Sequence, residues 1–180
     1  MRELTGSGSA TSYTATRIQV YTGQHFDGFI ARLESAVPLF SPEQLEGADT
    51  WAAVARLVET MAPHNFVFFF QMTPSNAMRI AGSPTRSRTY LMGNPVTVER
   101  MYKHHPGVMV HAPLHVEVYE TARGRAMFLI ERPSAAFGSF GMDAIAEVGL
   151  ELDRQVDDLL AFLGVPGRER AVLTDPGSLP

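Results

Sequence analysis

A pair of short segments near the middle of the chain constrains its fold most strongly. Leu114–Glu120 (LHVEVYE) alternates apolar and polar residues, and the apolar-rich segment Arg125–Glu131 (RAMFLIE) follows after only four residues. Alternation with a period of two is typical of a β-strand that buries one of its faces. A connection this short cannot cross a sheet, so the two strands should pair antiparallel as a β-hairpin.

The rest of the chain combines further short strands with amphipathic helices. We predict strands at 16–21, 65–72 and 88–92, and helices at 26–37, after Ser41-Pro42, at 96–105 and at 140–163. The last helix has the clearest pattern, with apolar residues spaced by three or four: Ile145, Val148, Leu152, Val156, Leu159 and Leu163. The order of elements predicts an α+β fold, an antiparallel sheet with helices packed on it.

Length and composition exclude several classes of protein. A chain of 180 residues fits one domain, which we place at 13–165 between a flexible N-terminal tail (1–12) and a C-terminal tail (166–180). Without cysteine, thiolate chemistry and cysteine metal sites are excluded. A net charge of −4 without a basic block argues against nucleic acid as a partner. We find no membrane span and no signal peptide, so we expect a cytoplasmic protein.

The basic residues are almost all arginine, since Lys103 is the only lysine among 15. A GC-rich, bacterial genome explains this preference most simply. Recognition of anions by guanidinium groups is the functional alternative.

The pairing register of the hairpin determines which side chains lie together, because they alternate between the two faces of a strand. We expect the four residues 121–124 to form the turn, which pairs Tyr119 with Ala126. One face is then wholly apolar and should form the core beneath the last helix: Leu114, Val116, Val118, Met127 and Leu129. The other face mixes polar and apolar groups: His115, Glu117, Tyr119, Ala126, Phe128 and Ile130.

This mixed face is the predicted floor of a ligand pocket. The segment 65–72 (NFVFFFQM) reads as a strand covered on both faces, and its Phe68 and Phe70 should extend the floor together with Phe128 and Ile130. A large aromatic face is not usually left in water, so helices, a second subunit or a ligand should cover it. The alternative is an outward face with ordinary cross-strand contacts.

His115, Glu117 and Tyr119 are the candidate catalytic residues. Beneath a cover, an imidazole beside a carboxylate suits general acid–base chemistry near neutral pH, and the tyrosine hydroxyl would orient a substrate. His111, Asn94 and Arg88 are further candidate ligand-binding residues. Asn94 lies in Gly93-Asn94-Pro95, where the start of a helix could present backbone N–H groups to an anion or could simply form a turn.

We predict no metal site and no cofactor. In an extended strand, His111 and His115 would lie about 13 Å apart, too far to share one ion. A haem held by one histidine in an apolar pocket is the alternative, because it needs a single ligand.

Several motifs together resemble the domain-of-unknown-function 302 (DUF302) family. They are YLMGNPVTVERMYKHHP (90–106), HAPLHVEVYE (111–120), the Gly124 hairpin, ERPS (131–134) and the long last helix. The resemblance covers about 64–165 and implies a small α+β domain with a sheet related to the TATA-binding-protein-like fold. It implies no catalytic residue. Residues 13–62 lie outside it, and the helix that carries Trp51 reads as an elaboration of a subgroup.

Three functions follow from these observations. The first is a domain that binds a small apolar or aromatic molecule at the mixed face of the 113–131 hairpin. The second is a cofactor-independent isomerase, cyclase or lyase that uses His115 and Glu117 as proton carriers. The third is a module that forms a homodimer through the same face without a ligand. We expect a small-molecule partner and a homodimeric assembly.

Overall fold

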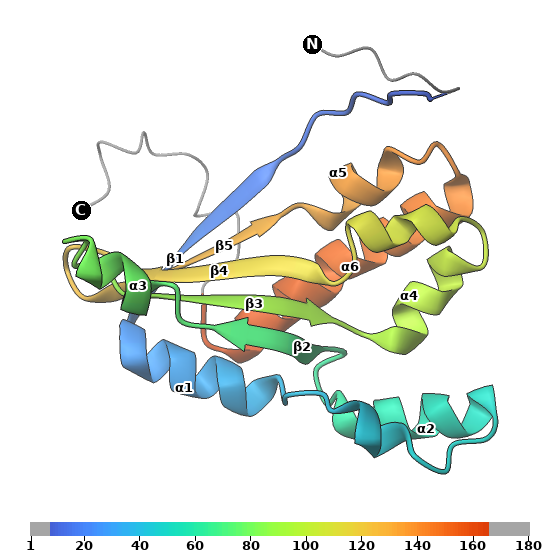
Figure 1. The fold of residues 1–180 in the computed structure, drawn as a ribbon, viewed down its shortest axis with the longest axis horizontal. Coiled ribbons are helices and arrows are strands. Elements are labelled where there is room, and N and C mark those ends of the chain that lie inside the picture. The colour runs from blue at the N-terminus through green and yellow to red at the C-terminus, as the bar shows by residue number, and fades with distance from the viewer. Residues whose placement is uncertain (1–7, 166–180) are drawn as a thin grey trace.

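A computed structural model describes residues 8–165, so residues 1–7 of the predicted N-terminal tail (1–12) and the whole predicted C-terminal tail (166–180) lie outside the described residues. The sheet is five-stranded and antiparallel throughout, in the order β1-β5-β4-β3-β2 (Figure 1). Its strands are β1 (Arg17–His25), β2 (Val67–Met72), β3 (Ser87–Gly93), β4 (Leu114–Glu120) and β5 (Arg125–Glu131). The α+β prediction is confirmed, and so are the bounds of both hairpin strands.

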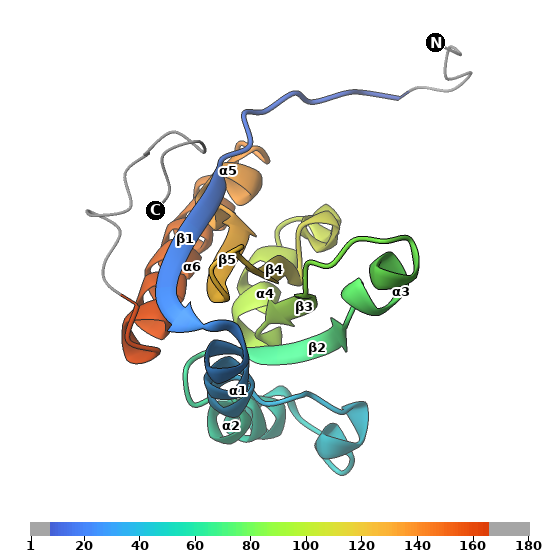
Figure 2. The same ribbon diagram turned by 90° about the vertical axis from the view of Figure 1, so that its left-hand side faces the viewer.

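Two long helices cover one face of the sheet. Figure 2 places α1 and α6 together on one side and α3 near the other side. The helices are α1 (Phe26–Ala36), α2 (Trp51–Met61), α3 (Ser75–Ile80), α4 (Pro95–Tyr102), α5 (Pro133–Gly138) and α6 (Asp143–Phe162), with 3₁₀ turns at Pro42–Leu45 and Pro106–Val110. None of the helices within the described ranges is long and apolar enough for a membrane crossing.

The hairpin turn is one residue shorter than predicted. Thr121 continues the ladder, because its N–H donates to the carbonyl oxygen of Arg125 at 2.8 Å. The loop therefore contains only residues 122–124, and Gly124 closes it with φ at 72°. A three-residue loop that ends in a left-handed glycine is a common hairpin connection. As a result, Tyr119 pairs with Met127, and the predicted pairing with Ala126 is wrong.

The shift by one residue changes which residues of β5 enter the core. Phe128 and Ile130 pair with Val118 and Val116, and all four are buried on the helix-covered face. The ring of Phe128 meets that of Phe29 in α1 edge-on, with centroids 6.5 Å apart. The core beneath α6 is confirmed for the apolar residues of β4 but not for Met127 and Leu129, which lie on the other face.

Strand β2 is an edge strand, and the prediction that both of its faces are covered holds only for its first half, where Val67 and Phe68 are buried. A parallel bridge from Leu39 protects only its first half, where Phe68 exchanges backbone hydrogen bonds with Pro38 and Phe40. Further along, Phe70 is 47% exposed and Met72 is 43% exposed. Apolar content alone does not distinguish a central strand from an edge strand, because position in the sheet is decided by the other strands.

Helix α5 was not predicted, and close contact with α6 holds it in place. The Ser134 hydroxyl donates to the Asp153 carboxylate at 2.6 Å, and the Ser134 backbone N–H donates to the same carboxylate at 3.1 Å. Gly149 allows the two helices to approach, since a Cβ there would stand 3.1 Å from both Ser134 Cα and Phe137 Cβ. The contact explains why a helix of only six residues is stable here.

Candidate functional site

The face of the sheet opposite α1 and α6 is the candidate site, and we call it the open face. Pairing in the ladders places one set of side chains on it: Gln19, Tyr21, Phe70, Met72, Thr89, Leu91, His115, Glu117, Tyr119, Met127 and Leu129. Helix α2 reaches only the edge of this side, where it packs near Val67 and Phe69. The open face therefore presents a mixed surface directly from the strands.

A row of three polar side chains runs along β4 at the centre of the open face. Glu117 accepts a hydrogen bond of 2.5 Å from the hydroxyl of Thr89, its partner on β3. Tyr119 accepts a hydrogen bond of 3.2 Å from the Gln19 side chain, which reaches across β5 from β1. His115 is exposed. The predicted row is thus present, with two of its members oriented by neighbouring strands.

Apolar side chains lie directly beside this row. Leu91 pairs with His115, and Leu129 pairs with Glu117, and both leucines are half-buried. Met127 is only 2% exposed, because its register places it between Tyr21 on β1 and Tyr119 on β4. Every polar group of the row therefore has an apolar cross-strand neighbour.

Three of the predicted pocket residues lie elsewhere. Phe128 and Ile130 occupy the core for the register reason given above. Phe68 pairs with Met92 and stacks on Tyr90 with ring centroids 4.3 Å apart, also in the core. Phe70 does reach the open face, since an irregularity in β2 between Phe68 and Phe70 shifts its pairing to Leu91. Phe68, Phe128 and Ile130 are therefore not on the open face, whereas Phe70 is.

The remaining predicted ligand contacts also lie away from the open face. The ring of His111 contacts the rings of Tyr13, Phe137 and Phe140, at centroid distances of 5.5, 6.2 and 6.1 Å. The Asn94 side chain caps α4 by accepting from the backbone N–H groups of residues 96 and 97. Arg88 pairs with Val118, which puts it on the helix-covered side.

The capping role of Asn94 bears on the expected anion site. The first N–H groups of α4 donate to the Asn94 carboxamide oxygen at 2.8 and 3.2 Å. A helix start whose N–H groups already have an acceptor is a weak anion site. The turn alternative thus describes this motif better.

Sequence reasoning missed the partners that orient the polar row. Thr89, Leu91 and Gln19 could have been found from strand parity, because each lies on a predicted strand. Their pairing with β4 and their approach across β5 depend on the order of strands in the sheet, which no local pattern reveals.

A buried tyrosine forms a second polar contact on the helix-covered side. The Tyr90 hydroxyl donates to the Glu34 carboxylate of α1 at 2.9 Å, and the ring is fully buried. Burial, together with the hydrogen bond to Glu34, raises the pKa of Tyr90 well above its usual range. Tyr90 therefore stays protonated and ties β3 to α1.

In the described part of the chain, no cluster of three or more His, Asp or Glu residues could hold a metal ion.

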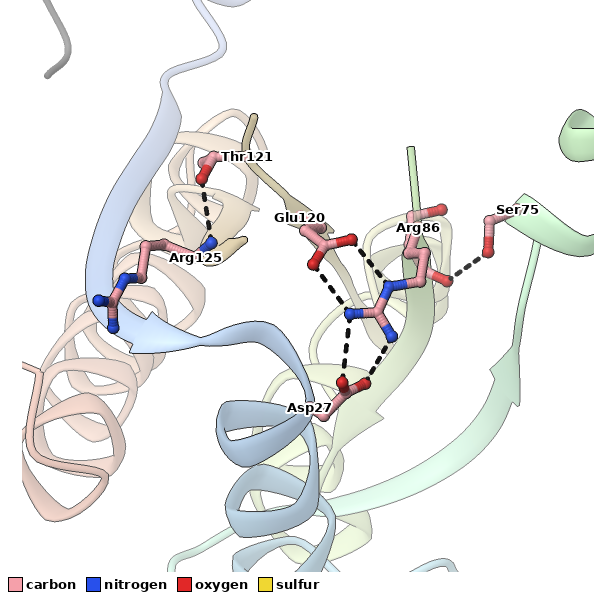
Figure 3. Close-up of polar contacts among 7 residues, drawn as sticks. Asp27, Ser75, Arg86, Glu120, Thr121 and Arg125 are labelled. Atoms are coloured by element: carbon pink, nitrogen blue, oxygen red, sulfur yellow. Dashed lines mark hydrogen bonds and ion pairs between the residues drawn. The ribbon is translucent and has the colours of Figure 1, made fainter. Parts of the chain in front are cut away.

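Arg86, in the segment just before β3, joins β4 to α1 at the end of the sheet (Figure 3). Arg86 makes paired hydrogen bonds to Glu120 on β4, both at 2.8 Å, and to Asp27 at the start of α1, at 2.8 and 3.2 Å. Its guanidinium lies 4.8 Å from the centroid of the Phe26 ring. The bidentate geometry suits a structural clamp between α1 and the hairpin.

We expect replacement of Arg86 with glutamine to flatten the acid dependence of stability. Hydrogen bonds from Arg86 lower the pKa of the Glu120 carboxyl group in the folded protein. A lowered pKa stabilises the fold above the unfolded value, near 4.3, and this contribution is lost as the pH falls below it. The variant should lose roughly 1 kcal/mol at pH 7, because the site is partly exposed.

Urea unfolding at about pH 7 and about pH 3.5 measures this effect. The wild type should lose more stability between the two values than Arg86→Gln does. Equal losses in the two proteins would show that the Arg86–Glu120 contact contributes nothing to the fold.

Comparisons with known proteins agree with this architecture. The family model described as "Domain of unknown function DUF302" matches residues 44–163. The match includes α2, so the prediction that the Trp51 helix is a subgroup elaboration is wrong. The chain also resembles the crystal structure of an uncharacterized conserved protein DUF302 from Bacillus stearothermophilus, with a TM-score of 0.59 and 16% identity. That similarity covers 81% of this chain and 95% of the other. No curated protein matches the chain.

Proposed function

We propose that this chain, which belongs to the DUF302 family, binds a small amphipathic molecule with an aromatic or apolar body on its open face. The observation that carries the proposal is the interleaving of polar and apolar side chains on a face that α1 and α6 do not cover. Binding sites for small molecules typically combine apolar walls with a few placed polar groups.

The polar row limits the size of the ligand. His115 and Tyr119 are four residues apart on one strand, which corresponds to about 13 Å at about 3.3 Å per residue. Two or three linked rings could lie along this length. Leu91 and Leu129 flank the row on the two neighbouring strands and would contact the faces or edges of such rings.

The hydrogen-bonding groups limit the chemistry of the ligand. The Glu117 carboxylate can accept a hydrogen bond from a hydroxyl or amine, and the imidazole of His115 can donate or accept one. Tyr119 accepts from Gln19, which leaves its hydroxyl proton available for a ligand acceptor. A neutral ring compound with a hydroxyl group matches this arrangement better than an anion does, because Glu117 would repel negative charge.

The acid–base alternative stays a prediction. Glu117 and His115 form no ion pair with each other in residues 8–165, and the Glu117 carboxylate bonds to Thr89 instead. A paired His115 and Glu117, as predicted for acid–base chemistry, would thus require Glu117 to turn away from Thr89. Binding needs no such rearrangement, so the geometry supports it better.

A titration with 2-naphthol, followed by ¹H–¹⁵N NMR spectra, tests the proposal. We expect saturable shift changes in the amides of β3, β4 and β5. Replacing Leu129 with glutamine should weaken binding about fivefold, which corresponds to a loss of about 1 kcal/mol of apolar contact. Leu150→Gln is the matched control, because Leu150 is a 52% exposed leucine on α6.

Three results would overturn the proposal. The first is the absence of saturable shifts, and the second is a response confined to residues outside the open face. The third is a set of open-face shifts that depends on protein concentration without any ligand, since this would identify a second copy of the chain as the occupant.

A further inference from the structure

We propose that a second site, in a groove between α1 and the end of α6, binds a small aromatic carboxylate. The groove has a volume of about 270 Å³. Three elements line it: α1, the segment before β2, and the C-terminal end of α6. The lining residues are Arg32, Ser35, Ala36, His64, Phe162 and Leu163. Because it lies beside the helices, the groove is separate from the open face.

An aromatic pair forms one wall of the groove. The ring of His64 lies against the ring of Phe162, with centroids 3.8 Å apart and planes tilted by 34°. Phe162 is nevertheless 62% exposed, so most of its surface remains available to another ring. An exposed phenylalanine held in position by a neighbouring ring is well suited to stack on an aromatic ligand.

The charge in the groove favours an anion. Arg32 is exposed and has no carboxylate within salt-bridge distance among residues 8–165, in contrast to Arg86 and Arg100. A free guanidinium can make two parallel hydrogen bonds to one carboxylate. Ser35 belongs to α1, as Arg32 does, and also lines the groove, so its hydroxyl is a further donor.

The size and the apolar floor favour a single ring. Ala36 and Leu163 are both buried and line the groove. A volume of about 270 Å³ lies just below the usual range of small-molecule sites, so only a small ligand fits. One ring with a carboxylate attached would place its ring over the floor and its charge at Arg32. The two sites therefore select different ligands, a neutral hydroxyl compound on the open face and an acid in the groove.

Titration of the ¹⁵N-labelled protein with benzoate tests this inference. We expect shift changes in amides around Arg32, His64 and Phe162. Replacing Arg32 with glutamine should weaken benzoate binding at least about tenfold, because one charge-assisted contact is lost. Arg123→Gln is the matched control, since it removes the same charge from the exposed residues of the hairpin loop. Benzyl alcohol, which lacks the charge, should bind wild type and Arg32→Gln equally weakly.

The outcomes separate the two proposals. The inference is wrong if benzoate does not bind, if Arg32→Gln binds it as wild type does, or if the shifts lie outside the groove. Leu129→Gln should leave benzoate binding unchanged, and Arg32→Gln should leave 2-naphthol binding to the open face unchanged. Each proposal can thus be refuted while the other is supported.

Discussion

Replacing Phe128 with alanine is expected to lower the free energy of unfolding by about 3–5 kcal/mol. Phe128 is fully buried, and its ring contacts that of Phe29 between the sheet and α1. Truncation removes these contacts and leaves a cavity that a strand paired on both sides cannot collapse to fill. Urea unfolding followed by far-UV circular dichroism measures the loss.

Leu129→Ala is the control for this prediction, because it truncates the next residue of the same strand toward the open face. Leu129 is half-buried, so we expect a cost of about 1 kcal/mol. The ratio of the two costs tests the hairpin register directly, since a slip by one residue exchanges the faces. Equal costs, or a larger cost for Leu129→Ala, would rule out the pairing of Tyr119 with Met127.

Replacing Gly149 with valine is expected to have the second-largest effect, a loss of about 1–3 kcal/mol. A Cβ at this position would already lie 3.1 Å from Ser134 Cα and from Phe137 Cβ. The two additional methyl groups of valine find no space, so α5 must move away from α6. The hydrogen bonds from Ser134 to Asp153 should then lengthen or break. Thermal unfolding measures the effect.

Gly28→Ala in α1 separates this steric effect from helix propensity. A Cβ at Gly28 would meet no atom within 4 Å. Alanine is the better helix former, so this variant should gain up to about 1 kcal/mol. A Gly149→Val protein that unfolds at the wild-type temperature would refute the close approach of α5 and α6.

The elements with the strongest periodicity could be predicted from the sequence. The alternation in β4 placed Leu114, Val116 and Val118 in the core, and all three are buried there. The three-to-four spacing of apolar residues predicted α6. Both patterns are local, because each needs only one element to bury one face.

The register of the hairpin could not be predicted from its strands. Loops of three and four residues both fit the segment between them, and the choice depends on whether Thr121 joins the ladder. This choice exchanged Phe128 and Ile130 for Met127 and Leu129 on the open face. A difference of one residue in loop length thus changes the cross-strand partner of every residue in the hairpin.

The short helix α5 and the edge position of β2 were missed for a related reason. Helix α5 depends on contacts with Gly149 and Asp153, which lie further along the chain in α6. The aromatic content of β2 predicted burial on both faces, but Phe70 and Met72 in its second half are exposed, and no strand pairs with its outer edge beyond Phe68 in residues 8–165. Whether residues of α5 and β2 are buried thus depends on segments that lie far from them in the sequence.

The sequence by itself determined that the imidazole, carboxylate and phenol at positions 115, 117 and 119 point the same way, because strand geometry alternates side chains without exception in a regular ladder. Only the tertiary structure decided which residues stand beside them and that α1 and α6 lie on the opposite side. Strand order, loop length and helix docking involve contacts between residues far apart in the chain. Their energies depend on the whole assembly of elements rather than on any one segment.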